Sequence, residues 1–221
     1  MLKNSLKIRP LAFTLIEVLI GLAMVAVIVV LFLPRLTHKD PTFRPECMSN
    51  LKQTGLGMWM WASDHDDKFP WQTSVTNDGA MELLTNGQAS AQFRPLAEFM
   101  PDDERSRIFV CPADSAKTKG ASIKELREEN VSYLVNADAA TNAATAQTIM
   151  AGDRNLQSDG QPVKPGLFWL TQETKTSWTE DIHLTGGNLV FLDGHVEWVG
   201  TNQAKAVFMK QPAGTSRLLV P

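Results

Sequence analysis

Apolar side chains fill residues 13–33 almost without interruption, and only Thr14, Glu17 and Gly21 break the run. A helix rises about 1.5 Å per residue, so a helix over this run would be roughly 31 Å long. That length matches the hydrocarbon core of a bilayer, which is about 30 Å thick. The pattern therefore predicts a transmembrane helix over residues 13–34.

A second helical pattern covers residues 47–62, after a segment with two prolines at residues 37–45 that predicts a break in the helix. One or two further short helices are predicted within residues 78–100. Short strands are predicted where apolar and β-branched residues cluster, at residues 108–111, 131–136, 148–152 and 167–170. These elements indicate an α+β domain after the apolar helix.

The strongest strand pattern is an alternation over residues 187–199, with Asp193-Gly194 near its centre. This dipeptide is typical of a two-residue type I′ turn, so we expect a hairpin in which Phe191 lies opposite Val196. One face of the hairpin would then be apolar and face the core, with Leu189, Phe191, Val196 and Trp198. The other face would be half exposed, with Val190, Leu192, His195 and Glu197.

The composition limits the classes of protein. The chain has 221 residues, 43% of them hydrophobic and 20% charged, and a net charge of −3. This allows one membrane segment and one domain of about 175 residues with a core of its own. The mild acidity, with no basic run after the apolar segment, argues against a nucleic-acid partner.

The chain has two cysteines, Cys47 and Cys111. An even pair permits one disulfide but does not require it. If the bond formed, it would close a loop of about 64 residues and contribute about 4 kcal/mol in the loop-entropy model. The alternative is a pair of buried thiols, because a free cysteine behaves as a small apolar residue.

Glu17 is the unusual residue of the apolar run. A carboxylate in such a helix costs about 3 kcal/mol on membrane insertion, so it normally has a partner. The residues before the run carry Lys3, Lys7 and Arg9, but the run is too long for an ordinary signal peptide. A cut between Ala12 and Phe13 would create an amine at Phe13 that could pair with Glu17 of a neighbouring copy.

Residues 12–20, AFTLIEVLI, resemble the processing motif of type IV prepilins and type II secretion pseudopilins. The resemblance implies that a prepilin peptidase cuts between Ala12 and Phe13 and that the new N-terminus at Phe13 is methylated. It also implies that Glu17 guides assembly. Ala12 departs from the family pattern, in which glycine is usual. The resemblance places the N-terminus in the cytoplasm and the C-terminal domain in the periplasm.

A second resemblance covers the other end of the chain. His183, Asp193 and Gly194 form an H-X9-D-G pattern, and Cys47 begins a C-x-x-N-L-K-Q pattern. The first pattern resembles a family of prepilin-processing-associated proteins that is named for the H-X9-D-G motif. The second resembles the outer half of the helix in a large bacterial group of pilin-like proteins. In pilin-like proteins the N-terminal helix continues out of the membrane and packs on a sheet.

Two groups of polar residues are candidate metal ligands. Carboxylate oxygens suit Ca²⁺, so Asp64, Asp66 and Asp67 are candidates, although no complete calcium-loop pattern follows. The alternative is a solvated helix end. His183, Asp193 and His195 would suit Zn²⁺, but Asp193 is also explained by the turn. We expect no resident metal or cofactor. Because no activated serine or cysteine is evident, we do not expect an enzyme.

We therefore expect an α+β, pilin-like fold, in which a long N-terminal transmembrane helix packs on a small antiparallel sheet. The expected parts are a leader at 1–12, a transmembrane and assembly helix at 13–34, a linker and outer helix at 35–65, and an extracytoplasmic head domain at 66–221. The expected location is the inner membrane, with a single span, and then a filament after assembly.

The expected function is that of a structural subunit of a type IV pilus-like or type II secretion pseudopilus filament. Its partners would be the prepilin peptidase, other pilin or pseudopilin subunits and the inner membrane. The alternative is a membrane-anchored, extracytoplasmic protein that binds a polysaccharide or another surface ligand. Two or more coplanar, exposed tryptophan rings among Trp71, Trp169, Trp178 and Trp198 would favour the alternative.

Overall fold

The fold was obtained as a computed structural model, which describes residues 14–37, 44–100, 106–143, 147–211 and 215–221. The chain divides into two compact units, residues 1–38 and residues 39–221. The predicted leader, the cleavage site at Ala12 and Phe13, and part of the predicted linker lie outside the described residues. Each unit is described separately below.

The first unit contains one helix, α1 (Leu15–Thr37). The Glu17 carboxylate accepts hydrogen bonds from the Thr14 backbone N–H, at 2.9 Å, and from the Thr14 hydroxyl, at 2.8 Å. The sequence alone suggested no obvious partner for this carboxylate, and the two Thr14 donors supply one. They form the kind of reciprocal cap that fixes the start of a helix.

The predicted membrane span is contradicted. Among the residues that the structure describes, no helix is both long enough and apolar enough to cross a membrane. This finding contradicts three linked predictions. They are the transmembrane helix over 13–34, the single-pass topology, and the inner-membrane location with a periplasmic C-terminal domain.

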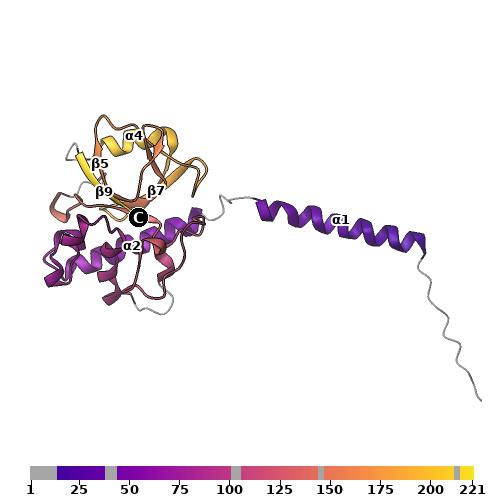
Figure 1. The fold of residues 1–221 in the computed structure, drawn as a ribbon, viewed down its shortest axis with the longest axis horizontal. Coiled ribbons are helices and arrows are strands. Elements are labelled where there is room, and N and C mark those ends of the chain that lie inside the picture. The colour runs from indigo at the N-terminus through magenta and orange to yellow at the C-terminus, as the bar shows by residue number, and fades with distance from the viewer. Residues whose placement is uncertain (1–13, 38–43, 101–105, 144–146, 212–214) are drawn as a thin grey trace, which may run out of the picture. The chain divides into compact units, whose positions relative to one another are not determined.

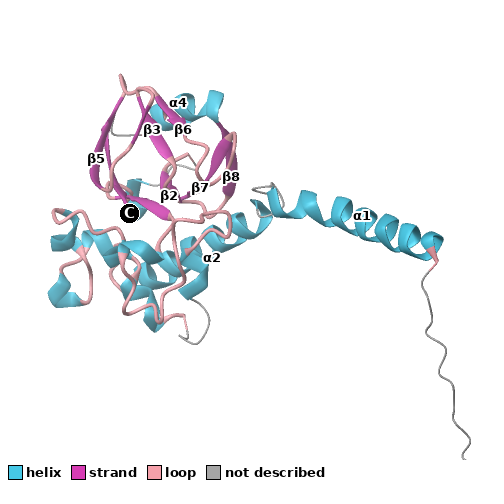
Figure 2. Ribbon diagram, turned by 45° about the vertical axis from the view of Figure 1, so that its right-hand side comes forward, coloured by secondary structure: helices cyan, strands magenta, loops and turns pink. Residues whose placement is uncertain are grey.

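The second unit is built on a six-stranded antiparallel sheet in the order β5-β9-β1-β2-β7-β8. A smaller antiparallel sheet has the order β4-β3-β6. Figure 2 shows the strands above α2, with β3 and β6 close to α4. The helices are α2 (Arg44–Ser63) and α4 (Thr201–Met209). The strands are β1 (Tyr133–Asn136), β2 (Ile149–Asp153), β3 (Leu156–Ser158), β4 (Gln161–Pro162), β5 (Gly166–Thr171), β6 (Thr176–Trp178), β7 (Gly186–Phe191), β8 (Val196–Gly200) and β9 (Thr215–Val220).

Short 3-10 helices follow one another along the chain between α2 and β1. They are η2 (Pro70–Gln72), η3 (Val75–Asn77), η4 (Met81–Leu84), η5 (Ser90–Gln92), η6 (Arg94–Glu98), η7 (Ser106–Phe109) and η8 (Glu128–Asn130), and η9 (Thr141–Ala143) follows β1. They replace the one or two helices predicted within residues 78–100. The predicted strand at residues 108–111 is wrong, because η7 covers its first half and a short apolar run does not distinguish a strand from a helical turn.

The six-stranded sheet separates two cores, because successive side chains of a strand point to opposite faces. In β7, Val190 belongs to the core under α2, and Leu189 belongs to the core that α4 and the smaller sheet cover. Every residue of β7 is buried. The strands predicted at 131–136, 148–152 and 167–170 are confirmed as β1, β2 and β5.

The pilin-like fold predicted from the sequence is wrong for this chain. The domain consists mainly of two antiparallel sheets with short helices, where one small sheet was expected. The helix that packs on the large sheet is α2, which has polar residues on its solvent side, whereas the more apolar α1 lies in the other unit. Figure 1 draws and labels α1 and α2 as two distinct helices.

The hairpin β7–β8 exists as predicted, but its register differs by one residue. Val190 lies opposite Val196, and Leu189 lies opposite Glu197. The Gly194 N–H donates to the Phe191 carbonyl, at 2.9 Å, and the Phe191 N–H donates to the His195 carbonyl, at 3.0 Å. Gly194 has a φ of 83°, so the loop has three residues and ends in a left-handed one. The face predicted to be half exposed therefore carries two core residues, Val190 in β7 and Leu192 just after it.

Candidate functional site

The residues of the H-X9-D-G pattern do not form one site. His183 precedes β7 and Asp193 follows it, so the length of a strand separates them. Asp193 instead binds locally: its carboxylate accepts from the His195 backbone N–H, at 3.0 Å, and contacts the His195 ring nitrogen Nδ1. His195 also stacks on Phe191, with ring centroids 4.3 Å apart. This end of the pattern shapes the turn.

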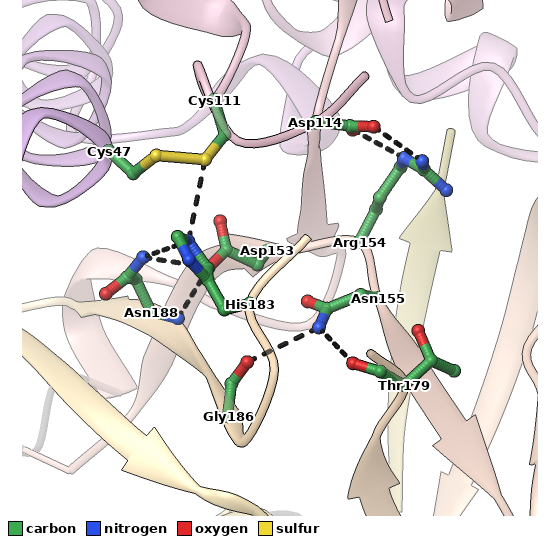
Figure 3. A network of polar contacts seen from close by, with 10 residues as sticks. All are labelled: Cys47, Cys111, Asp114, Asp153, Arg154, Asn155, Thr179, His183, Gly186 and Asn188. Atoms are coloured by element: carbon green, nitrogen blue, oxygen red, sulfur yellow. Dashed lines mark hydrogen bonds and ion pairs between the residues drawn. A yellow bond between two sulfur atoms is a disulfide. The ribbon is translucent and has the colours of Figure 1, made fainter. Parts of the chain in front are cut away.

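The other end of the pattern belongs to a buried polar cluster between α2 and the sheet (Figure 3). Cys47 of α2 and Cys111, which follows η7, form a disulfide, and neither side chain is exposed. The His183 Nε2 atom lies 3.5 Å from the Cys111 Sγ atom. The disulfide joins α2 to a segment 64 residues later in the chain, and the imidazole of His183 lies next to it. Sequence reasoning had left open whether the cysteines pair.

Two residues that sequence reasoning did not single out complete the cluster. The Asp153 carboxylate, at the end of β2, accepts from the Asn188 backbone N–H at 2.7 Å and from its side-chain Nδ2 at 2.9 Å. The His183 Nε2 atom lies 3.1 Å from Asn188 Nδ2 and 3.4 Å from Asp153 Oδ2. The sequence signal for Asp153 was its position at the end of an apolar strand, and an aspartate in that position is equally typical of the start of a loop.

The loop that carries His183 is held at both ends by Asn155. Its side-chain amide donates to the Thr179 carbonyl, at 2.8 Å, and to the Gly186 carbonyl, at 3.3 Å. On the other side of the cluster, Arg154 makes a two-pronged ion pair with Asp114, with both N–O distances at 2.7 Å. Figure 3 shows that Asp153, Arg154 and Asn155 point in different directions from one segment. Three consecutive residues therefore organise this buried region.

Burial shifts the two titratable groups of the cluster in opposite directions. Desolvation raises the pKa of the Asp153 carboxyl to about 7, although the hydrogen bonds from Asn188 oppose the shift. Desolvation, followed by the charge of Arg44, lowers the pKa of the His183 imidazole to about 4. Between pH 4 and 6.5 the folded protein therefore keeps Asp153 protonated and His183 neutral.

We expect the substitution Asp153→Asn to make folding stability depend on pH between 4 and 6.5. In the wild type, the unfolded chain binds a proton on His183 and the folded chain binds one on Asp153, so this pair causes no net uptake. Without Asp153, only the unfolded chain takes up a proton, because the folded pKa of His183 lies at about 4. The contribution of neutral, buried His183 to the free energy of unfolding is then fully present above pH 6.5. It is lost as the pH falls toward 4, by about 3 kcal/mol.

Urea unfolding of the wild type and the Asp153→Asn variant at a series of pH values measures this difference. Other titrating groups are common to both proteins, so their effects cancel when the two free energies of unfolding are subtracted. The difference should grow as the solution becomes more acidic. Two curves that run parallel from pH 7 to 4 would show that the pair does not titrate in this way.

The other predicted ligands and platforms lie apart from the cluster. Asp64, Asp66 and Asp67 lie in an exposed turn after α2. Among the described residues, their carboxylate oxygens do not converge closely enough to form a metal site. Of the four tryptophans named as a ligand platform, only Trp169 is exposed, at 60%. Trp71 and Trp178 are buried, and the Arg44 guanidinium covers the ring of Trp198 at 3.7 Å. The criterion set for a tryptophan binding surface is not met.

Searches against protein-family models, curated proteins and solved structures found no match to this chain.

Proposed function

We propose that this chain is a structural subunit of a filament of the type IV pilus or type II pseudopilus class. In this proposal the prepilin peptidase cuts between Ala12 and Phe13, and the mature chain then assembles with other subunits through α1. The processing motif at residues 12–20 supports the first step. The exposed surface of α1 supports the second.

The observation that carries the proposal is the exposure of α1. Its described large apolar side chains, from Leu15 to Ile28, are between 48% and 80% exposed, and they lie on every side of the helix. A helix that is apolar all round requires burial, because its hydration is unfavourable. The second unit already has two filled cores of its own. We infer that copies of the same helix bury α1 in an assembly.

The N-terminal residue of the protein purified from its native cells tests the processing step. Mass spectrometry should find a chain that begins with methylated Phe13. A chain that still begins with Met1 would contradict the proposal, because the assembly interface needs the new amine. Substitution of Ala12 by a bulky residue such as leucine should leave the leader uncut in the same measurement.

Glu17 has two candidate roles, and one pair of variants separates them. In the uncut chain its carboxylate caps α1 through Thr14, and in the assembly it would pair with the Phe13 amine of a neighbour. Glutamine keeps the hydrogen-bonding shape of a cap but carries no charge. If pairing sets the axial register, Glu17→Gln and Glu17→Ala should both reduce assembly strongly.

Filament yield, measured by shearing and electron microscopy of cells that express each variant, reads out this comparison. The far-UV circular dichroism of the purified chains is the control, since Glu17→Gln should retain the helix. Normal filaments in Glu17→Gln together with loss in Glu17→Ala would assign Glu17 to capping alone. Normal filaments in both variants would remove Glu17 from assembly altogether.

A further inference from the structure

The buried cluster contains the elements of a metal site that the disulfide conceals. In the part of the chain that the structure describes, one group of three metal-ligating residues converges: Cys47, Cys111 and His183. Their sulfur and ring-nitrogen atoms all lie within 4.8 Å of one another, and all three side chains are buried. A disulfide sulfur is a poor ligand, whereas a thiolate binds Zn²⁺ strongly.

The distances around His183 match the edges of a zinc tetrahedron. With Zn–S and Zn–N bonds of about 2.3 and 2.05 Å, a tetrahedral ion separates a sulfur from a nitrogen ligand by about 3.5 Å. It separates a nitrogen from an oxygen ligand by about 3.4 Å. The observed distances from His183 Nε2 are 3.5 Å to Cys111 Sγ and 3.4 Å to Asp153 Oδ2. The edge between His183 and Cys111 is therefore already in place, and the second distance shows that the Asp153 carboxylate lies beside the imidazole, with its Oδ2 atom nearest.

The group of three does not include Asp153, but its carboxylate is the candidate for the fourth position and gives an independent sign of an unfilled role. The residue is completely buried, and its Oδ1 atom has no hydrogen-bond partner among the described residues. A buried carboxylate oxygen without a partner is costly, so such atoms are rare in folded proteins. Asn188 holds the other oxygen, Oδ2, with two hydrogen bonds. Such an outer partner fixes the orientation of a ligating carboxylate.

We propose that the thiol form of this protein binds one Zn²⁺ ion through Cys47, Cys111, His183 and Asp153. A dithiol reductant first gives two electrons and two protons to the sulfur pair and itself becomes a disulfide. The freed sulfurs then rotate apart to about 3.8 Å, the third kind of edge in the tetrahedron. Binding of Zn²⁺ displaces the two thiol protons to solvent and, where the Asp153 carboxyl is protonated, its proton as well. The ion would replace the covalent tie between α2 and Cys111 by a coordinate one.

The surroundings of the cluster define the type of site. All four ligand residues are buried, so no position remains open to water, as in structural rather than catalytic zinc sites. Two thiolates and an imidazole favour Zn²⁺ over Ca²⁺ or Mg²⁺, which take oxygen ligands. The proposal does not depend on the filament function, since it concerns only the second unit.

Metal titration of the full-length chain tests the site. The protein is treated with a phosphine reductant, freed of metal, and titrated with Co²⁺ and then Zn²⁺. We expect one Co²⁺ per chain, with thiolate-to-cobalt charge-transfer absorption and tetrahedral ligand-field bands, and displacement by Zn²⁺. The oxidised chain, which has the same sequence, should show neither band.

Matched variants separate this site from adventitious surface binding. His195→Ala removes an exposed histidine and should bind as the wild type does. His183→Ala should weaken binding by more than the roughly 10- to 100-fold that loss of an outer partner costs. A Cys47→Ala, Cys111→Ala double variant should lose the charge-transfer band entirely.

Two results would overturn the proposal. One is equal stoichiometric binding by the reduced wild type and the double cysteine variant. The other is a reduced wild type that binds no Co²⁺ or Zn²⁺, which includes a reduced chain that unfolds and that Zn²⁺ does not refold. The circular dichroism of the reduced protein with and without Zn²⁺ identifies this second result.

Discussion

The substitution Asp114→Ala should lower the free energy of unfolding by about 3–5 kcal/mol. The Asp114 side chain is 1% exposed, and it forms both N–O contacts with Arg154 at 2.7 Å. Its removal leaves the guanidinium of Arg154, which is only 18% exposed, without its carboxylate partner. For a domain of this size the loss corresponds to a drop in melting temperature of roughly 10 °C.

Two further variants distinguish this effect from a general loss of charge. Arg127→Ala removes an ion pair whose side chains are 76% and 66% exposed and 4.0 Å apart, so it should change stability by less than about 0.5 kcal/mol. A double variant that combines Asp114→Ala with Arg154→Met should recover part of the loss, because no unpaired charge remains buried. Chemical denaturation of the three proteins measures these differences. A loss below about 1 kcal/mol in Asp114→Ala would contradict the expected role of the pair.

Removal of the disulfide should cost about 4 kcal/mol, because the Cys47–Cys111 bond closes a loop of 64 residues in the unfolded chain. Cys47→Ala, Cys111→Ala and the double variant should all lose a similar amount, since each of them breaks the same bond. The sulfur atoms add little more, because both side chains have the size of a small core residue.

Urea unfolding of the three variants under metal-free, oxidising conditions measures the loss. The wild type with a reductant provides a control in which no side chain is changed. If the double variant lost twice as much as either single variant, the two sulfurs would be acting as independent core residues. The bond would then contribute little through chain entropy.

The sequence predicted the local elements well where a periodic pattern was long or a turn signal was strong. The helix predicted at 47–62 is α2, and the Asp193-Gly194 dipeptide does join two strands. The register of that hairpin was wrong, because the same dipeptide also suits a three-residue loop that ends in a left-handed glycine. The choice between these loops places Val190 opposite Val196, in the core under α2. Only the packing on both faces of β7 decides it.

The buried cluster shows the opposite limit. The sequence patterns indicated His183 and both cysteines as candidate residues, but they did not indicate Asp153 or Asn188. Their positions are separated by tens of residues along the chain, so no local pattern relates them. They meet because β2 and β7 are neighbours in the large sheet, and that neighbourhood depends on long-range strand pairing.

The amino-acid sequence by itself determined the apolar character of α1, the resemblance of residues 12–20 to a prepilin processing motif and the alternation of the C-terminal hairpin, because these depend only on neighbouring residues. Tertiary structure alone decided that two sheets enclose two cores, that Cys47 bonds to Cys111, and that His183 and Asp153 share one buried space. Contacts of this kind arise from residues far apart in the chain. Burial then changes the properties of the groups that meet, as the pKa values of Asp153 and His183 demonstrate.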